Sequence, residues 1–129
     1  MLRTGILNPA LLSLLARVRH TNTLVIADRG FPFWPQIETL DLSLVDGIPT
    51  VAQVLDALRP NFVMGRVFAA REFTEVNTPA TVEALRSRLG EVPLVLEPHV
   101  EFKRRVPQAI GLIRTGDTVQ YANLIIESA

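Results

Sequence analysis

Two histidines, an aspartate and a tyrosine–asparagine pair are the residues of this sequence best suited to proton transfer and hydrogen bonding. His20 follows an apolar segment with helical spacing, and Asp28 comes directly after a short apolar run. An imidazole with an unperturbed pKa of about 6.5 can accept or donate a proton near neutral pH. His99, Tyr121 and Asn123 add a second imidazole, a phenol and an amide. The set favours acid–base and hydrogen-bond chemistry.

Each of these residues also has a purely structural interpretation. A charged His20 at the end of a helix would interact favourably with the helix C-terminus, and Asp28 could accept backbone N–H groups within a turn. His99 could simply begin a helix on the surface. Tyr121 and Asn123, two apart on an expected strand, would share one face, which could equally be exposed surface. Taken singly, these residues leave both interpretations open.

Several other chemistries are excluded by the residues that the sequence lacks. There is no cysteine, so disulfides, thiolate metal sites and a cysteine nucleophile are ruled out. Neither histidine has a second one three to five residues away, and we expect no metal site. The first expected strand is followed by DRGFP rather than a glycine-rich turn, and no Walker-type loop occurs. We therefore expect a protein without a cofactor.

Composition bears on partners and location. Thirteen basic residues balance thirteen acidic ones, so we expect no nucleic-acid or membrane-surface partner. No apolar run approaches the roughly 20 residues of a membrane helix, and no signal-peptide pattern occurs, which favours a cytoplasmic location. Hydrophobic residues make up 48% of the chain and charged residues only 20%. Apolar surface lying against other subunits would explain this balance, and we expect a homo-oligomer.

Apolar spacing predicts that strands and helices alternate along the chain. We expect helices over residues 9–19, 51–58, 79–89 and 99–106 and strands over residues 23–27, 40–44, 62–70, 94–96, 109–114 and 121–126. A turn at residues 115–117 would join the last two strands into a hairpin. The pattern predicts a single α/β domain over residues 1–129, with a mixed β-sheet of about six strands covered by helices on both faces.

Taken in order, the same residues match a known pattern. The matching blocks are GILNP at residues 5–9, HTNTLVIADRGFP at 20–32, DLSL and GIPT at 41–50, and IRTGD with YANLII at 113–126. This order and spacing closely resemble the family of ribose pyranases and fucose mutarotases. The resemblance covers nearly the whole chain and is weakest between residues 62 and 96.

The resemblance implies a role for each candidate residue. His20 would be the acid–base residue of a reaction that opens and recloses the ring of a free monosaccharide, without metal or cofactor. The other residues implied to bind the sugar are Asp28, His99, Tyr121, Ala122 and Asn123. The context of His99 is similar to the ribose branch, which makes ribose the expected sugar. A fucose-type mutarotase and a non-catalytic sugar-binding or transport-accessory module stay open as alternatives.

The loop after Asp28 departs from the family pattern. Arg29, Phe33 and Trp34 give it a bulkier and more basic character than the small aliphatic loop associated with the ribose branch. The choice of sugar within the family is therefore open.

The spacing of His20 and Asp28 makes a geometric prediction. Eight residues in an extended conformation would span roughly 26 Å, so the two side chains cannot meet along a straight strand. Either the chain folds back at Thr21 and Asn22, or the site is shared between subunits. The resemblance to ring-forming decamers favours a ring-based oligomer, possibly a decamer, with sites near subunit interfaces.

Overall fold

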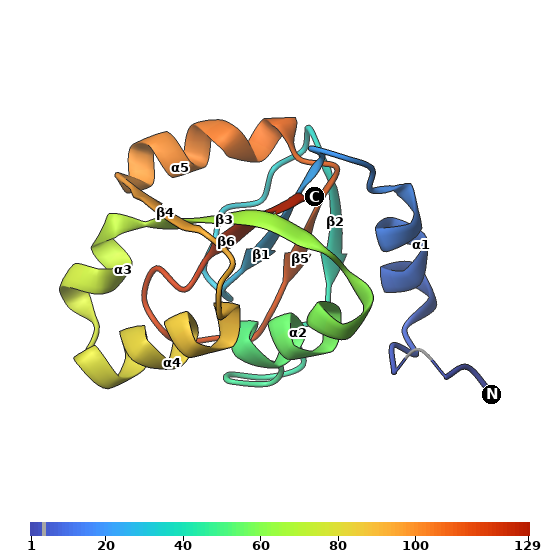
Figure 1. Ribbon diagram of the computed structural model, residues 1–129, viewed down its shortest axis with the longest axis horizontal. Coiled ribbons are helices and arrows are strands. Elements are labelled where there is room, and N and C mark those ends of the chain that lie inside the picture. Colours follow the sequence, from blue (N-terminus) through green and yellow to red (C-terminus); the bar gives the residue numbers. More distant parts are fainter. Residues whose placement is uncertain (4) are drawn as a thin grey trace.

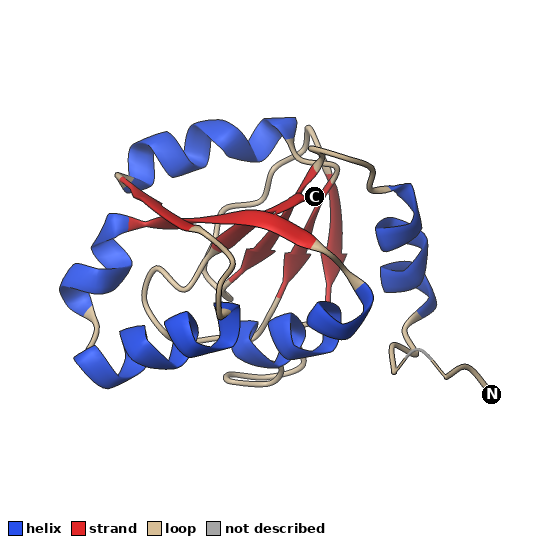
Figure 2. Ribbon diagram, viewed as in Figure 1, coloured by secondary structure: helices blue, strands red, loops and turns tan. Residues whose placement is uncertain are grey.

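A six-stranded mixed β-sheet organises the chain in the computed structural model, which describes residues 1–3 and 5–129 (Figures 1 and 2). The strands are β1 (Thr23–Ala27), β2 (Glu38–Asp41), β3 (Met64–Ala70), β4 (Leu94–Glu97), β5 (Gly111–Arg114) and β6 (Leu124–Ser128). The helices are α1 (Pro9–Arg17), α2 (Val51–Leu58), α3 (Arg71–Val76), α4 (Pro79–Leu89) and α5 (His99–Arg105). Within the described residues, no helix combines the length and apolar character needed to cross a bilayer.

The strand order determines which loops meet. The sheet runs β2-β5-β1-β6-β3-β4, and only β6 is antiparallel to its neighbours among the described strands. The carboxyl ends of the other five strands therefore lie at one edge of the sheet, together with the start of β6. Open α/β sheets form their ligand crevices at this edge.

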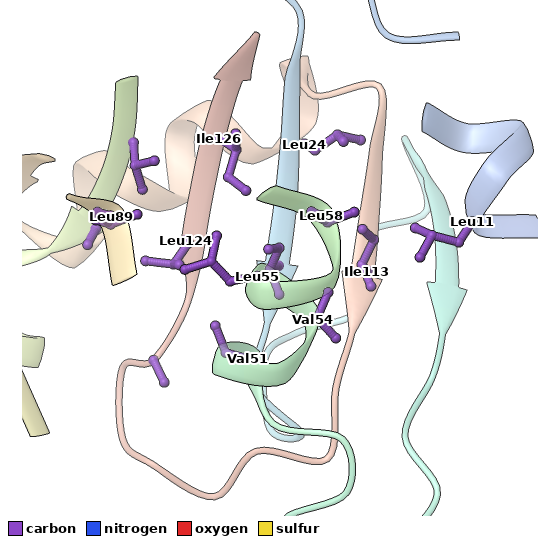
Figure 3. Close-up of a cluster of buried hydrophobic side chains, with 14 of the residues drawn as sticks. Leu11, Leu24, Val51, Val54, Leu55, Leu58, Leu89, Ile113, Leu124 and Ile126 are labelled. Atoms are coloured by element: carbon purple, nitrogen blue, oxygen red, sulfur yellow. The ribbon is translucent and has the colours of Figure 1, made fainter. Parts of the chain in front are cut away.

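Alternate side chains of β1 pack into two separate cores, one on each face of the sheet. Helices cover both faces, which confirms the expected mixed sheet with helices on both faces. Leu24 and Ile26 join a buried cluster with residues of α1, α2 and α4 (Figure 3). Val25 and Ala27 point the other way and pack in a second cluster with Phe102 of α5. Successive strand residues face opposite sides, so a strand buried on both faces reads as a continuous apolar run.

Helix starts follow the expected capping signals. The Asn8 side chain accepts the N–H of Leu11, and Thr50 forms a reciprocal capping box with Gln53 at the start of α2. The first helix ends at Arg17 rather than at residue 19, because Val18 already has an extended backbone.

The predicted C-terminal hairpin is wrong. The last two strands do not pair with each other, since β5 lies parallel to β1 on one side and β6 lies antiparallel to β1 on the other. The last strand also begins at Leu124 instead of Tyr121, which leaves Tyr121 and Asn123 in the preceding loop. Short apolar runs reveal that strands exist, but not which neighbour each one pairs with.

Other elements also differ from the sequence prediction, in their bounds or in not being predicted. The second strand occupies Glu38–Asp41, and Leu44, expected at its end, is exposed in the following turn. The third begins at Met64, two residues later than expected. Helix α3 was not predicted, because its six residues are too few to display helical periodicity.

Candidate functional site

The topology brings Asp28, His99, Tyr121 and Asn123 together. Asp28 follows β1, His99 begins α5 after β4, and Tyr121 and Asn123 precede the antiparallel β6. All four line one open pocket at the carboxyl edge of the sheet. Its lining residues are Asp28, Gly30, Phe31, Pro32, His99, Gln120, Tyr121 and Asn123. Sequence reasoning found the chemistry-bearing members, and the sheet order explains why they meet.

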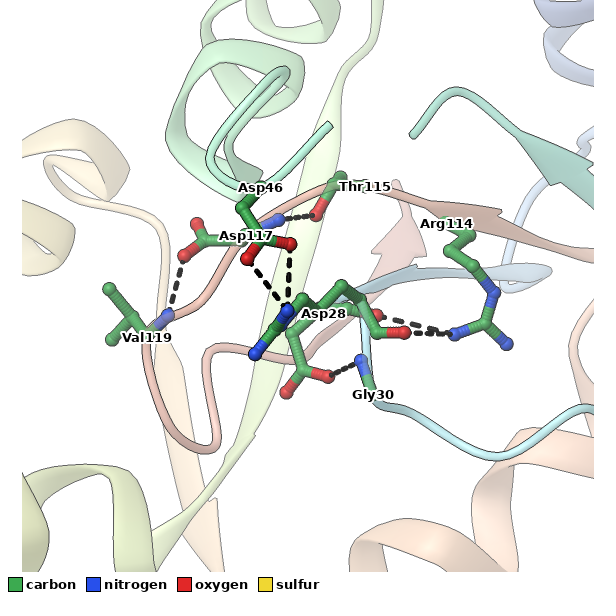
Figure 4. Close-up of polar contacts among 8 residues, drawn as sticks. Asp28, Gly30, Asp46, Arg114, Thr115, Asp117 and Val119 are labelled. Atoms are coloured by element: carbon green, nitrogen blue, oxygen red, sulfur yellow. Dashed lines mark hydrogen bonds and ion pairs between the residues drawn. The ribbon is translucent and has the colours of Figure 1, made fainter. Parts of the chain in front are cut away.

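Asp28 is held by two partners. Its Oδ1 accepts the backbone N–H of Gly30 at 2.9 Å, and its Oδ2 accepts a hydrogen bond from Asn123 Nδ2 at 3.0 Å (Figure 4 shows the Gly30 bond). Asn123 Oδ1 in turn accepts the backbone N–H of Asp28 at 2.7 Å. A carboxylate has about four acceptor positions, so two remain for a ligand's hydroxyl groups.

The His99 ring lies in an aromatic environment. It stacks on Phe102 with ring centroids 5.9 Å apart, and it contacts Tyr121 edge to face at 5.0 Å and Phe31 at 6.2 Å. Nδ1 is buried without a hydrogen-bond partner among the described residues. Burial, aided by the positive charge of Lys103, lowers the pKa of His99 below its ordinary value of 6.5, and the carboxylates of Glu72 and Asp28 oppose this effect. The lowered pKa favours the neutral form of the ring at pH 7.

The Tyr121-Ala122-Asn123 segment is a loop with a left-handed residue rather than a strand. Tyr121 has φ +56°, so the backbone turns between Tyr121 and Asn123. The Ala122 side chain is buried and lines a different, largely apolar pocket between α2 and α4. Asn77 Nδ2 donates to the carbonyl oxygen of Gln120 at 2.9 Å and supports the loop from α3. Of the three consecutive residues, two face the polar pocket.

Arg114, at the end of β5, organises the loop after Asp28. Its guanidinium donates to the carbonyl oxygens of Asp28, Arg29 and Pro32, each at 3.3 Å (Figure 4 shows the bonds to Asp28 and Arg29). Sequence reasoning did not assign it a role. Its place in the IRTGD block, which matches the family pattern, was the available signal.

A buried network lies behind the pocket. Asp117 is 6% exposed and accepts the backbone N–H groups of Val51 and Val119, while its own N–H donates to Thr115 Oγ1 (Figure 4 shows the bonds to Val119 and Thr115). The Asp117 carbonyl accepts the N–H of Arg29. Sequence reasoning also missed Asp117, which links the start of α2 to the loop after β1. A carboxylate with backbone donors at both oxygens serves structure here.

Arg29, one of the departures from the family pattern, lies on the surface. Its guanidinium pairs with Asp46 at 2.7 Å, and both side chains are more than half exposed. The pair joins the loop after β1 to the turn after β2. An exposed pair of this kind contributes about 0–1 kcal/mol to stability.

His20 lies at the opposite edge of the sheet. It is exposed in a turn before β1, where Thr21 has φ +64° and the Thr21 N–H donates to Ser128 O at the end of β6. The turn leads straight into the strand, and the length of β1, about 13 Å at roughly 3.3 Å per residue, separates it from Asp28. The fold-back considered from the sequence does not occur. His20 and the other candidate site residues therefore do not meet within one chain.

The described residues contain no group of three or more histidine, aspartate or glutamate side chains arranged for a metal ion. What the pocket offers is a fixed carboxylate, a neutral imidazole, a phenol and an amide, with an aromatic wall. These groups suit a small neutral ligand that carries several hydroxyl groups.

The chain belongs to the RbsD / FucU transport protein family, whose model matches residues 1–129. It is 42% identical over 128 residues to a D-ribose pyranase of Geobacillus kaustophilus, covering 99% of this chain and 93% of that protein. It is 39% identical to a D-ribose pyranase of Corynebacterium glutamicum, covering 99% and 97%.

Two solved structures share the fold. Bacillus subtilis RbsD in complex with D-ribose superposes with a TM-score of 0.92 at 32% identity, covering 100% of this chain and 98% of that one. A fucose mutarotase of Streptococcus pneumoniae in complex with L-fucose gives a TM-score of 0.81 at 19% identity, covering 95% and 92%. The second likeness supports the fold alone.

Proposed function

We propose that this chain is a monosaccharide mutarotase that interconverts the pyranose and furanose forms of a free sugar, with D-ribose as the first candidate. The observation that carries the proposal is the Asp28 carboxylate, fixed by Asn123 and Gly30 with acceptor positions left, beside the imidazole of His99 in one open pocket. The names of the full-length relatives support ribose over fucose.

Ring opening requires only proton transfers. A base takes the proton of the anomeric hydroxyl, the bond between the anomeric carbon and the ring oxygen breaks, and an acid protonates that oxygen to give the open aldehyde. Reclosure by a different hydroxyl gives the other ring size. Positioned acid–base groups contribute about 100- to 10,000-fold to such steps. The reaction consumes no co-reactant.

The pocket residues would hold the sugar while its protons move. Asp28 accepts hydrogen bonds from sugar hydroxyls, and Tyr121 and Asn123 line the same pocket with a phenol and an amide. His99 is neutral, and its buried Nδ1 favours the tautomer with the proton on Nε2, because buried N–H groups without acceptors are rarer than unused lone pairs. His99 therefore acts as a hydrogen-bond donor to a sugar oxygen. Ala122 lies between Tyr121 and Asn123 and would contribute only its backbone to the pocket.

Proton transfer is left to His20, which we assign to a second copy of the chain. His20 is exposed, and it lies across the sheet from the pocket of its own chain. Exposed apolar residues, Leu44, Val45 and Ile48, lie in the turn that Arg29 joins to the pocket loop, and apolar surface there suits contact with another copy. A homo-oligomer with shared sites follows, with a decameric ring as its expected form. A cytoplasmic location stays a prediction.

Saturation-transfer NMR on ribose and fucose tests the reaction. The wild-type protein should accelerate exchange between pyranose and furanose ribose above the buffer rate. The His20→Ala variant should lose this acceleration while the Arg86→Ala variant, altered on the exposed side of α4, keeps it. Faster exchange of fucose than of ribose would assign the fucose branch. Sugar binding without faster exchange would overturn the proposed enzymatic activity and favour a non-catalytic sugar-binding module.

A further inference from the structure

Glu72 contacts the candidate site from an element that the sequence did not predict. It lies in the first turn of α3, and both of its carboxylate oxygens accept the backbone N–H of His99, at 2.9 Å and 3.2 Å. The bond joins the carboxyl ends of the neighbouring parallel strands β3 and β4. We infer that Glu72 is a positioning residue of the sugar pocket that acts through His99; this inference rests on the proposed function.

The His99 ring depends on this anchor because few directional contacts hold it. Its ring neighbours Phe31, Phe102 and Tyr121 are aromatic and contact it by packing, and its Nδ1 has no hydrogen-bond partner among the described residues. Pro98 precedes α5 and provides no side-chain cap. The Glu72 carboxylate therefore fixes the turn from which the imidazole projects into the pocket. A shift of about 1 Å in this turn would move the donor away from a bound sugar oxygen.

Glu72 also acts on the charge of His99. Burial, and the positive charge of Lys103 on the same helix, lower the pKa of the imidazole. The carboxylates of Glu72 in α3 and Asp28 in the loop after β1 raise it. Tyr121 contacts the ring edge to face. Removing the charge of Glu72 must therefore lower the pKa of His99 further. A residue that merely stabilised the fold would leave this pKa unchanged.

Two substitutions separate the hydrogen bond from the charge. Glu72→Gln keeps a carbonyl acceptor but removes the charge, whereas Glu72→Ala removes both. Glu75→Gln, on the exposed side of the same helix, is the control with an equal change of charge. The chain has only two histidines, so their imidazole NMR signals can be assigned with the His20→Ala variant. Each protein is titrated without sugar, and its affinity for ribose and its KM and kcat are then measured.

We expect Glu72→Ala to weaken ribose binding and raise KM about tenfold, the usual effect of losing a charged hydrogen bond, and Glu72→Gln to restore most of the affinity. In both variants His99 should titrate at a lower pH than in the wild type, and Glu75→Gln should behave as the wild type. An unchanged His99 titration and an unchanged KM in Glu72→Ala would overturn the inference. If the wild type binds no sugar, the proposed function fails, while the titration still decides whether Glu72 acts on His99.

Discussion

Asn123 contacts Asp28 through both ends of its amide group. Its Oδ1 accepts the Asp28 backbone N–H, and its Nδ2 donates to the Asp28 carboxylate. The two bonds fix the amide orientation, since a flipped amide would place two donors, and two acceptors, against each other. A residue that is 2% exposed thus sets the direction of the carboxylate that faces the pocket.

Replacing Asn123 by aspartate keeps the shape but changes the chemistry. The new carboxylate cannot donate to Asp28, and two like charges at hydrogen-bond distance raise the pKa of the pair. We expect ribose affinity to fall at least about tenfold at pH 8 and to recover partly when the pH is lowered to about 5, because a raised pKa favours uptake of a proton by the pair. Calorimetric titration at both pH values measures this. Gln36→Glu, an exposed change of equal charge, should bind normally; wild-type affinity in Asn123→Asp at pH 8 would contradict the role of the amide.

A shared site predicts complementation between inactive variants. His20→Ala retains an intact pocket, and Asp28→Asn retains an intact His20. In a randomly reassembled equal mixture, about a quarter of the sites would combine an intact pocket with an intact histidine. We expect about a quarter of the wild-type exchange rate after the two variants are unfolded and refolded together. An inactive mixture whose hybrid assembly is verified by mass spectrometry would show that the site is not shared in this way.

Arg114 should affect binding more than folding. Arg114→Met removes three hydrogen bonds to the loop of residues 28–32, each 3.3 Å long, and we expect a loss of about 1–2 kcal/mol of stability. The loop carries Asp28, so KM should rise several-fold while the protein stays folded. Steady-state exchange kinetics and thermal unfolding measure the two effects. Arg86→Met on α4 is the control, and an unchanged KM in Arg114→Met would show that the loop keeps its shape without the guanidinium.

The titration of His99 links pH to stability. Burial, with a smaller effect of Lys103, holds its pKa in the folded protein below 6.5, its ordinary value, so the unfolded chain binds more protons between the two pKa values. Stability therefore falls as the pH drops from about 6.5 through this window and is fully retained above it. The His99→Gln variant lacks the titration, and we expect a flatter dependence of its Tm on pH between 7 and 5. Equal slopes for wild type and variant would contradict this assignment.

The sequence predicted most of the elements because their signals are local. Pro9 and Pro79 follow capping residues, and the run at residues 23–27 is continuously apolar, so α1, α4 and β1 were identified. The partner of β5 and β6 was predicted wrongly, as a hairpin of the two, since their true pairing with β1 depends on long-range contacts that leave no mark in a short strand.

The site was predicted as a set of residues but not as a geometry. The resemblance supplied Asp28, His99, Tyr121 and Asn123, which the structure brings into one pocket. Arg114 and Glu72 were missed because they act through backbone atoms of other segments. A hydrogen bond from a side chain to the backbone of a distant segment leaves no residue pattern in a single sequence. It can be identified once the strand order is known.

The pairing of β1 with β6 has a consequence for assembly. At one end of this ladder Asn123 holds Asp28, and at the other the Ser128 carbonyl accepts the Thr21 N–H beside His20. A slip of one residue between the strands would turn their side chains to opposite faces and displace both ends together. In the proposed oligomer, the ladder would thus set a fixed spacing between the pocket of one chain and the His20 that the same chain presents to a neighbouring copy. Any closed ring of copies must repeat that spacing at every joint.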